Sequence, residues 1–327
     1  MFSRRVLIAA VVVLAASTAL PARQSAGIRS GMGAEDTGAG DIRGSQDSPF
    51  QIFASRLKLD SKTQTPAAAQ VFLDTAKDAQ EVAQQILGVR QQLVNASLNN
   101  KDAEFAAARQ DYARTETKMV GFELHAFSSV YSTLKPNQQS GGTDAFAAIA
   151  GIFQVPVPEL RRGPGGGGGR GRGGDARLET NGSAVSFAQR GGRGGGQASG
   201  PVYLTRFEIL RSALKLDKTQ EKPIQTILDA SGKEAAPIRD QMTKTRAGVA
   251  AAAMAGKPQP EIDAAVTSYA DQTAAMAALE MKSLSQVVDS LTKEQMANAG
   301  GIQTAFYLMR GMFLDKNWDD IPGARSY

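Results

Sequence analysis

The sequence predicts an all-α protein that contains two similar helical-hairpin units joined by a Gly/Arg-rich linker. Three observations lead to this fold class. A block of about 105 residues occurs twice. Apolar residues within each block recur at steps of three and four. The composition is 42% hydrophobic but only 6% aromatic, and it is rich in helix-forming residues. We therefore expect two four-helix units and no sheet.

The repeat keeps one register over most of its length. Leu57-Lys58-Leu59-Asp60 returns as Leu214-Lys215-Leu216-Asp217, an offset of 157 residues. The same offset relates further pairs, namely Tyr112 and Tyr269, Met119 and Met276, Glu123 and Glu280, Leu134 and Leu291, and Gln138 and Gln295. Because chance does not maintain such a register, we interpret the chain as a tandem duplication.

Residues 1–22 are predicted to be a secretory signal peptide. Arg4 and Arg5 precede the apolar run from Val6 to Leu14, and small residues follow this run. The run is shorter than the roughly 20 residues of a membrane-spanning helix, so an uncleaved anchor is the less favoured alternative. Residues 23–47 are expected to be disordered. The predicted location is therefore periplasmic or secreted, and the absence of cysteine excludes a disulfide scaffold.

Residues 161–200 are predicted to be a disordered linker because glycine dominates them and apolar groups are scarce. This segment contains seven arginines and two acidic residues, so most of the positive net charge of the chain lies in it. The two repeats are close to neutral. The Arg-Gly runs contain no stacking aromatic residues and the chain is predicted to be exported, so nucleic-acid binding is not expected. A solvated spacer is favoured over weak contact with an anionic surface.

Each repeat is expected to contain a long antiparallel hairpin, with repeat 1 at 48–160 and repeat 2 at 201–314. In repeat 1 the helical spacing runs from Phe72 to Ala96 and again from Phe105 to Ala126. The breakers at 98–102 and 256–260 separate the two long helices of each hairpin. Shorter helices flank the hairpins, around 50–56, 144–153, 205–212 and 303–313. Residues 315–327 are expected to form a C-terminal tail.

Short motifs mark the hairpin junctions. Leu291-Thr292-Lys293-Glu294-Gln295 places a threonine where it can cap the helix that contains the glutamine. Three related elements also begin with leucine and end with glutamine, namely Leu59 to Gln64, Leu134 to Gln138, and Leu216 to Gln220. Two such elements around a helical hairpin, in an exported and cysteine-free chain, resemble the Spy/CpxP (LTxxQ-motif) family of periplasmic proteins. Only Leu291–Gln295 has the family pattern without change.

The resemblance implies hook-shaped four-helix hairpins that pair into a cradle, which in Spy-like members shelters unfolded clients. Family members are usually single units that dimerise, whereas this chain contains two. We expect the two repeats to pair within one chain as a pseudo-dimer, since a tether raises their effective concentration for each other. Two independent units that pair with other chains, forming a homo-oligomer, are the alternative.

The apolar residues of the repeats have two interpretations. They close the hairpin cores and the interface between repeats, or some of them form an exposed surface for apolar clients. The favoured interpretation is the core. The candidates for client binding are Met119, Phe122, Phe127, Phe146, Met276, Leu284, Tyr307 and Met309.

The residues give little support for enzymatic chemistry, a cofactor or a bound metal. His125 is the only histidine, and Lys282 occupies its position in repeat 2, so a solvated helix-surface residue is expected. Without cysteine, one chain cannot assemble a soft-metal site. Glu123 and Glu280 are expected to form salt bridges within their hairpins. The acidic residues near Asp315 are expected to be solvated charges.

The first functional hypothesis is a non-enzymatic, ATP-independent periplasmic chaperone or envelope-stress protein whose partners are unfolded or partly folded envelope proteins. The second is a structural or regulatory protein that binds one defined envelope partner. A hydrolase or metal protein ranks last. The exposure of the apolar residues in the folded protein distinguishes the first two hypotheses best.

Overall fold

The computed structural model describes residues 48–155 and 205–320, and every regular element in these two ranges is helical. The predicted signal peptide, the predicted disordered stretch 23–47 and the predicted linker 161–200 lie outside the described residues. We refer to residues 48–155 as unit one and residues 205–320 as unit two. The all-α fold class predicted from the sequence is thus confirmed for the described part of the chain.

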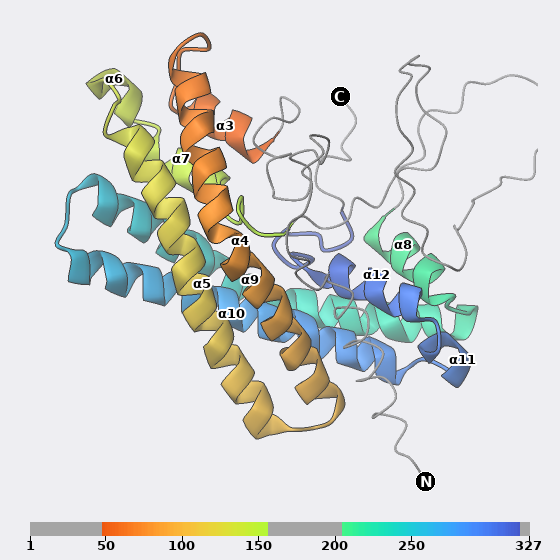
Figure 1. Ribbon diagram of the computed structural model, residues 1–327. Helices are drawn as coiled ribbons and strands as arrows, with labels where there is room; N and C mark the ends of the chain where they lie inside the picture. Colours follow the sequence, from red (N-terminus) through yellow and green to blue (C-terminus); the bar gives the residue numbers. More distant parts are fainter. Residues whose placement is uncertain (1–47, 156–204, 321–327) are drawn as a thin grey trace, which may run out of the picture. The chain divides into compact units, whose positions relative to one another are not determined.

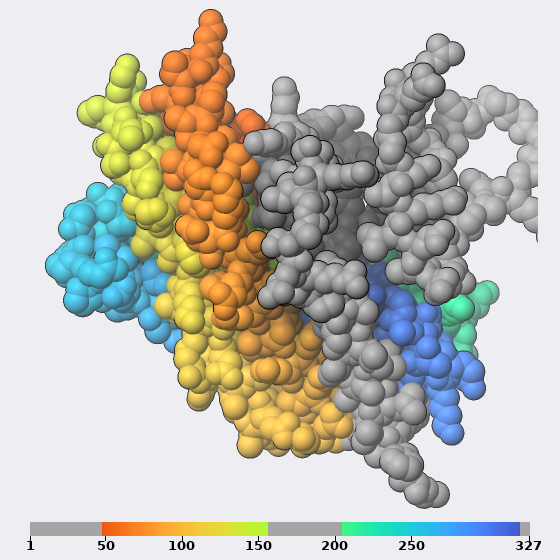
Figure 2. All heavy atoms as spheres, viewed as in Figure 1, coloured from red at the N-terminus to blue at the C-terminus, as the bar shows by residue number. Residues whose placement is uncertain are grey.

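Unit one is built around one long helical hairpin. The chain enters through α3 (Pro49–Arg56), continues through the long helices α4 (Gln64–Leu98) and α5 (Asp102–Tyr131), and ends with α6 (Pro136–Gln139) and α7 (Gly142–Ala148). Figure 1 shows α4 and α5 packed side by side, and Figure 2 shows them together on one face. Phe50, Phe53 and Phe72 form a cluster that joins α3 to the hairpin.

Unit two repeats this order of elements. Its helices are α8 (Arg206–Leu214), α9 (Lys218–Met254), α10 (Gln259–Asp289), α11 (Lys293–Met296) and α12 (Ala299–Met309). The turns also correspond, since Lys58 and Lys215 both adopt left-handed backbone conformations, as do Asn100 and Gly256. In both units the long helices form the hairpin that the spacing of apolar residues predicts.

The two units share one hydrophobic core. Helix α10 packs against both α4 and α5, and α7 packs against α9, so the hairpin of unit two lies across that of unit one (Figure 1). The chain segments of both units cluster into a single compact body. None of the helices in residues 48–155 and 205–320 combines the length and the hydrophobicity that a bilayer span requires.

The packed structure extends beyond the boundary expected for the C-terminal tail. Trp318 is 7% exposed, its ring packs edge-on against Phe207, and its indole N–H donates to Asp229. Gly232 permits this contact, because a Cβ there would lie 3.1 Å from the indole ring. Asp319 accepts from the backbone N–H groups of Arg206 and Phe207 at the start of α8. Residues 315–320 are therefore part of unit two. The expectation of solvated acidic residues there is wrong for Asp319, whereas the Asp315 side chain is 45% exposed beside Arg206.

Candidate functional site

The motif glutamines meet as reciprocal amide pairs. In unit one the side-chain amides of Gln64 and Gln138 exchange hydrogen bonds, with N–O distances of 2.9 and 3.3 Å. In unit two Gln220 and Gln295 do the same at 2.9 and 2.8 Å. Each pair joins the start of the long hairpin to its end. The sequence showed the four glutamines, but not that they bind one another.

The other motif atoms complete this junction. Gln295 Nε2 donates to the carbonyl of Lys215, whose left-handed conformation ends α8, at 2.8 Å. The Thr292 hydroxyl accepts from Gln295 N, and Gln295 Oε1 accepts from Thr292 N, so the cap expected from the sequence is present. Leu291 is 1% exposed. The motif therefore has structural contacts in both units, and among its leucines only Leu59 is half-buried.

Two glycines bring the last part of each unit against its first helix. A Cβ at Gly141 would lie 2.2 Å from the carbonyl oxygen of Arg56, and one at Gly301 would lie 2.2 Å from that of Ala213. Any side chain at these positions would push the backbone segments apart. The two glycines follow the motif glutamine at different distances, so the repeat pattern did not reveal them.

The units are joined by two buried ion pairs that cross between them. Arg90 of α4 donates to Glu280 of α10 at 2.6 Å, and Arg246 of α9 donates to Glu123 of α5. All four side chains are at most 5% exposed. The prediction that both glutamates form salt bridges is confirmed, but their placement within one hairpin is wrong. Because a buried charge requires a partner, each unit depends on the other here.

Each of these glutamates also accepts from a backbone N–H in its own unit. Glu123 Oε1 accepts from Gly151 at 2.6 Å, and Glu280 Oε1 accepts from Gly311 at 2.8 Å. Both glycines have positive φ angles, of +74° and +70°. The Arg246 guanidinium also lies over the Phe146 ring and donates a hydrogen bond to the backbone carbonyl of Phe146. The carboxylates thus link the end of each unit to the opposite unit.

A third buried acid, Glu116, lies beside this centre without a counterpart in unit two. Gln154 Nε2 donates to Glu116 Oε2 at 3.5 Å, and Gln154 Oε1 accepts from Arg310 Nη2 at 2.5 Å. Arg310 also donates to the carbonyl of Val155. Burial and the charge of Glu123 raise the pKa of Glu116 to about 8, against the opposing effect of the nearby arginines.

We expect Glu116→Gln to raise the melting temperature at pH 8 and to leave it nearly unchanged at pH 4. The pKa of Glu116 is raised from 4.5 to about 8 on folding, so the folded chain retains a proton that the unfolded chain loses in this range. Wild-type stability should consequently fall as the pH rises from 4.5 to 8. Thermal unfolding of both proteins across this range measures the effect. Parallel curves would contradict the assignment.

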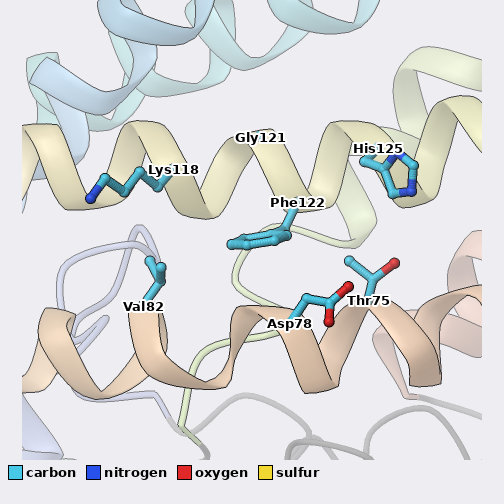
Figure 3. A pocket seen from close by; sticks show the side chains of 7 residues that line it. All are labelled: Thr75, Asp78, Val82, Lys118, Gly121, Phe122 and His125. Carbon is cyan, nitrogen blue, oxygen red and sulfur yellow. The ribbon is translucent and has the colours of Figure 1, made fainter.

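An open groove runs between α4 and α5 on unit one. Its volume is about 440 Å³, and it is lined by Thr75, Asp78, Val82, Lys118, Gly121, Phe122 and His125. Figure 3 shows the Phe122 ring between the two helices, with Thr75, Asp78 and Val82 projecting from α4 toward α5. At the corresponding place in unit two, Leu279 is 5% exposed and replaces the ring.

The groove offers an apolar surface next to polar groups that are available for binding. Phe122 is half-buried, whereas Asp78, Lys118 and His125 are exposed. Within the described residues, these three charged or titratable side chains form no hydrogen bond or ion pair. His125 is on the helix surface, as expected from the sequence. This combination can hold an apolar side chain flanked by charged or polar groups.

Most of the candidate client-binding residues are in the core. Six of them are buried, with at most 2% exposure, namely Met119, Phe127, Phe146, Met276, Leu284 and Met309. Phe127 and Phe146 pack edge-on against each other, and Phe146 contacts Arg246 between the units. Phe122 and Tyr307 are half-buried. The described conformation therefore presents only these two of the eight residues to a client.

The side chains of the described residues do not form a metal centre. No group of three or more histidine or acidic side chains with suitable spacing occurs in residues 48–155 and 205–320. The buried glutamates are instead bound to arginines and backbone N–H groups. Since the chain contains no cysteine and one histidine, its donor set does not fit a soft-metal site.

These features define, over residues 48–155 and 205–320, an all-helical protein whose two hairpin units are joined by reciprocal buried ion pairs. A family model described as heavy-metal resistance matches residues 181–298, a range that includes α8 to α11 of unit two. This family is related to the all-helical periplasmic proteins of Spy/CpxP type. The resemblance to that type of protein is therefore confirmed over the matched residues. No curated protein and no solved structure matches the chain.

Proposed function

We propose that this chain is a non-enzymatic, ATP-independent chaperone of the periplasm that binds unfolded or partly folded envelope proteins. The observation that carries the proposal is the groove between α4 and α5, where the Phe122 ring lies next to exposed charged and titratable side chains. An unfolded segment contains apolar side chains next to charged ones, and this surface matches both. The periplasmic location is an expectation from residues 1–22 and from the type of family matched.

We also infer that the two units arose by tandem duplication. Their helices follow the same order, and their amide pairs, left-handed turns and buried Arg–Glu pairs correspond. Duplication of a unit that dimerises through reciprocal contacts would place both partners in one chain. The paired hairpins then form a rigid support for the groove on unit one.

A second candidate is a structural or regulatory protein with one defined envelope partner. The burial of six of the eight candidate apolar residues favours it, because a small exposed apolar surface suits a narrow range of partners. A heavy-metal resistance role is compatible with either candidate. Protecting or regulating envelope proteins under metal stress would not require the chain itself to bind the metal.

The test is aggregation of reduced insulin and of heat-unfolded citrate synthase in the presence of the full mature chain. Phe122→Ser should remove a contact worth on the order of 1 kcal/mol, so about five- to tenfold more protein should be needed for equal suppression. Ile52→Ser is the matched control, since Ile52 is 39% exposed on α3 and is not part of the groove.

Suppression by the wild type and by Ile52→Ser, with weaker suppression by Phe122→Ser at equal melting temperature, would support the proposal. A wild-type chain that suppresses neither client would contradict the chaperone function. Equal suppression by all three proteins would show that clients bind elsewhere. One stoichiometric partner in an envelope pull-down, without any suppression, would favour the second candidate.

A further inference from the structure

The interface between the units has a reciprocal part that does not distinguish one unit from the other. Arg90 and Arg246 occupy corresponding positions in α4 and α9, and Glu123 and Glu280 correspond in α5 and α10. Each arginine binds the glutamate of the opposite unit. Two copies of unit one from different chains could form the same contacts, and so could two copies of unit two. This part therefore permits three pairings.

A second part of the interface belongs to one pairing only. Unit one provides Glu116 and Gln154, and unit two provides Arg310. The corresponding positions in the opposite units hold uncharged residues, which are Thr273, Leu314 and Ala150. Gln154 connects Glu116 to Arg310, because its amide N–H group is directed to Glu116 and its oxygen to Arg310. The contact requires one unit of each kind.

We propose that Glu116 and Arg310 specify the pairing of unit one with unit two and disfavour the pairing of like units from different chains. Two copies of unit one would place two Glu116 carboxyl groups at the interface without an Arg310. Two copies of unit two would bring two Arg310 guanidinium groups there, with Leu314 in place of the Gln154 acceptor. Carboxyl or guanidinium groups that are buried at an interface without a hydrogen-bonding partner oppose association. Each unit is thus paired with the other kind of unit and not with a second copy of itself.

The covalent connection between the units favours pairing within the same chain. Residues 156–204 connect the units covalently, which raises the effective concentration of unit two for unit one. The hydrogen-bonded contact of Glu116, Gln154 and Arg310 then selects unlike units, and the tether selects those of one chain. We expect the full chain to be a monomer with its units paired internally. This inference concerns the interface and does not depend on the chaperone proposal.

Engineered disulfides can report each pairing, because the chain has no cysteine of its own. The hydroxyls of Ser97 and Ser285 lie 2.7 Å apart across the interface. Ser97→Cys with Ser285→Cys should therefore form a disulfide within one chain, which migrates as a monomer on a non-reducing gel. Cross-linked dimers as the main product, or no disulfide at all, would overturn the pairing within one chain.

A second cysteine pair reports like-unit pairing. Ser128 corresponds in unit one to Ser285, so Ser97→Cys with Ser128→Cys should join two chains only if their first units pair. Within one unit these serines lie at opposite ends of the hairpin, roughly 40 Å apart at 1.5 Å per helical residue. With Glu116 and Arg310 intact, we expect only traces of this cross-linked dimer.

Glu116→Thr with Arg310→Ala gives each unit the residue that the other unit has at these positions. In the Ser97→Cys/Ser128→Cys background, this change should increase the cross-linked dimer at least tenfold. Glu116→Thr alone is the milder variant and should act in the same direction, since it removes the buried carboxyl group that opposes pairing of two first units. Circular dichroism identifies variants that remain folded. No increase in dimer for a folded variant would overturn the proposed specificity.

Discussion

Replacing Arg246 by methionine is expected to lower the free energy of unfolding by about 3–5 kcal/mol. The change preserves much of the aliphatic volume but leaves the Glu123 carboxylate, which is 1% exposed, without its counter-ion. It also removes the hydrogen bond to the Phe146 carbonyl and the contact with the Phe146 ring. Urea unfolding of the full chain, followed by circular dichroism, measures the loss.

Two further proteins make this result interpretable. Lys77→Met removes an exposed ion pair to Asp74, for which about 0–1 kcal/mol is expected. Arg246→Met combined with Glu123→Met replaces both buried charges by apolar groups and should recover much of the loss, because no uncompensated charge remains. A loss for Arg246→Met as small as that for Lys77→Met would show that the buried pair does not hold the units together.

The sequence was sufficient to predict the helical hairpins. Their apolar residues recur at helical spacing over more than 20 residues, and the breakers that end them are strong. The motif at Leu291–Gln295 was also predictable, since a threonine cap and its glutamine are neighbours in sequence. Both patterns depend only on residues that are close in sequence, so they can be recognised without knowing how the two units contact each other.

The ion pairs between units were missed for an identifiable reason. One additional residue between Asp60 and Gln64 changes the offset between the repeats from 157 to 156 along α4 and α9. With the wrong offset, Arg90 aligns with Ala247 instead of Arg246, so the recurring arginine was not recognised. Correcting the register at that insertion would have revealed a recurrent buried cation opposite a recurrent acid.

Exposure was the property that the sequence could not predict. The same apolar residue types fill a thin core and line a binding surface, so Phe122 and Phe127 are alike in sequence although only Phe127 is fully buried. Which side of a helix is covered depends on the second unit. Trp318 likewise follows no repeated pattern, and its burial arises from the tertiary contact with Gly232 and Phe207.

Two variants in the Leu291–Gln295 motif distinguish a structural role of the motif from a binding role. Leu291→Ala should lower the free energy of unfolding by about 2–5 kcal/mol, because it truncates a side chain that is 1% exposed. Thr292→Ala should cost about 1 kcal/mol, since it removes only the cap that accepts from Gln295 N.

Thermal unfolding and client-aggregation assays on both variants give the comparison. The structure predicts a large loss of stability for Leu291→Ala, a small one for Thr292→Ala, and client suppression at low temperature that matches the wild type for both. If the motif were instead a binding site, suppression would decrease while the melting temperature stayed constant. Wild-type stability in Leu291→Ala would refute the role of this leucine in closing the second hairpin.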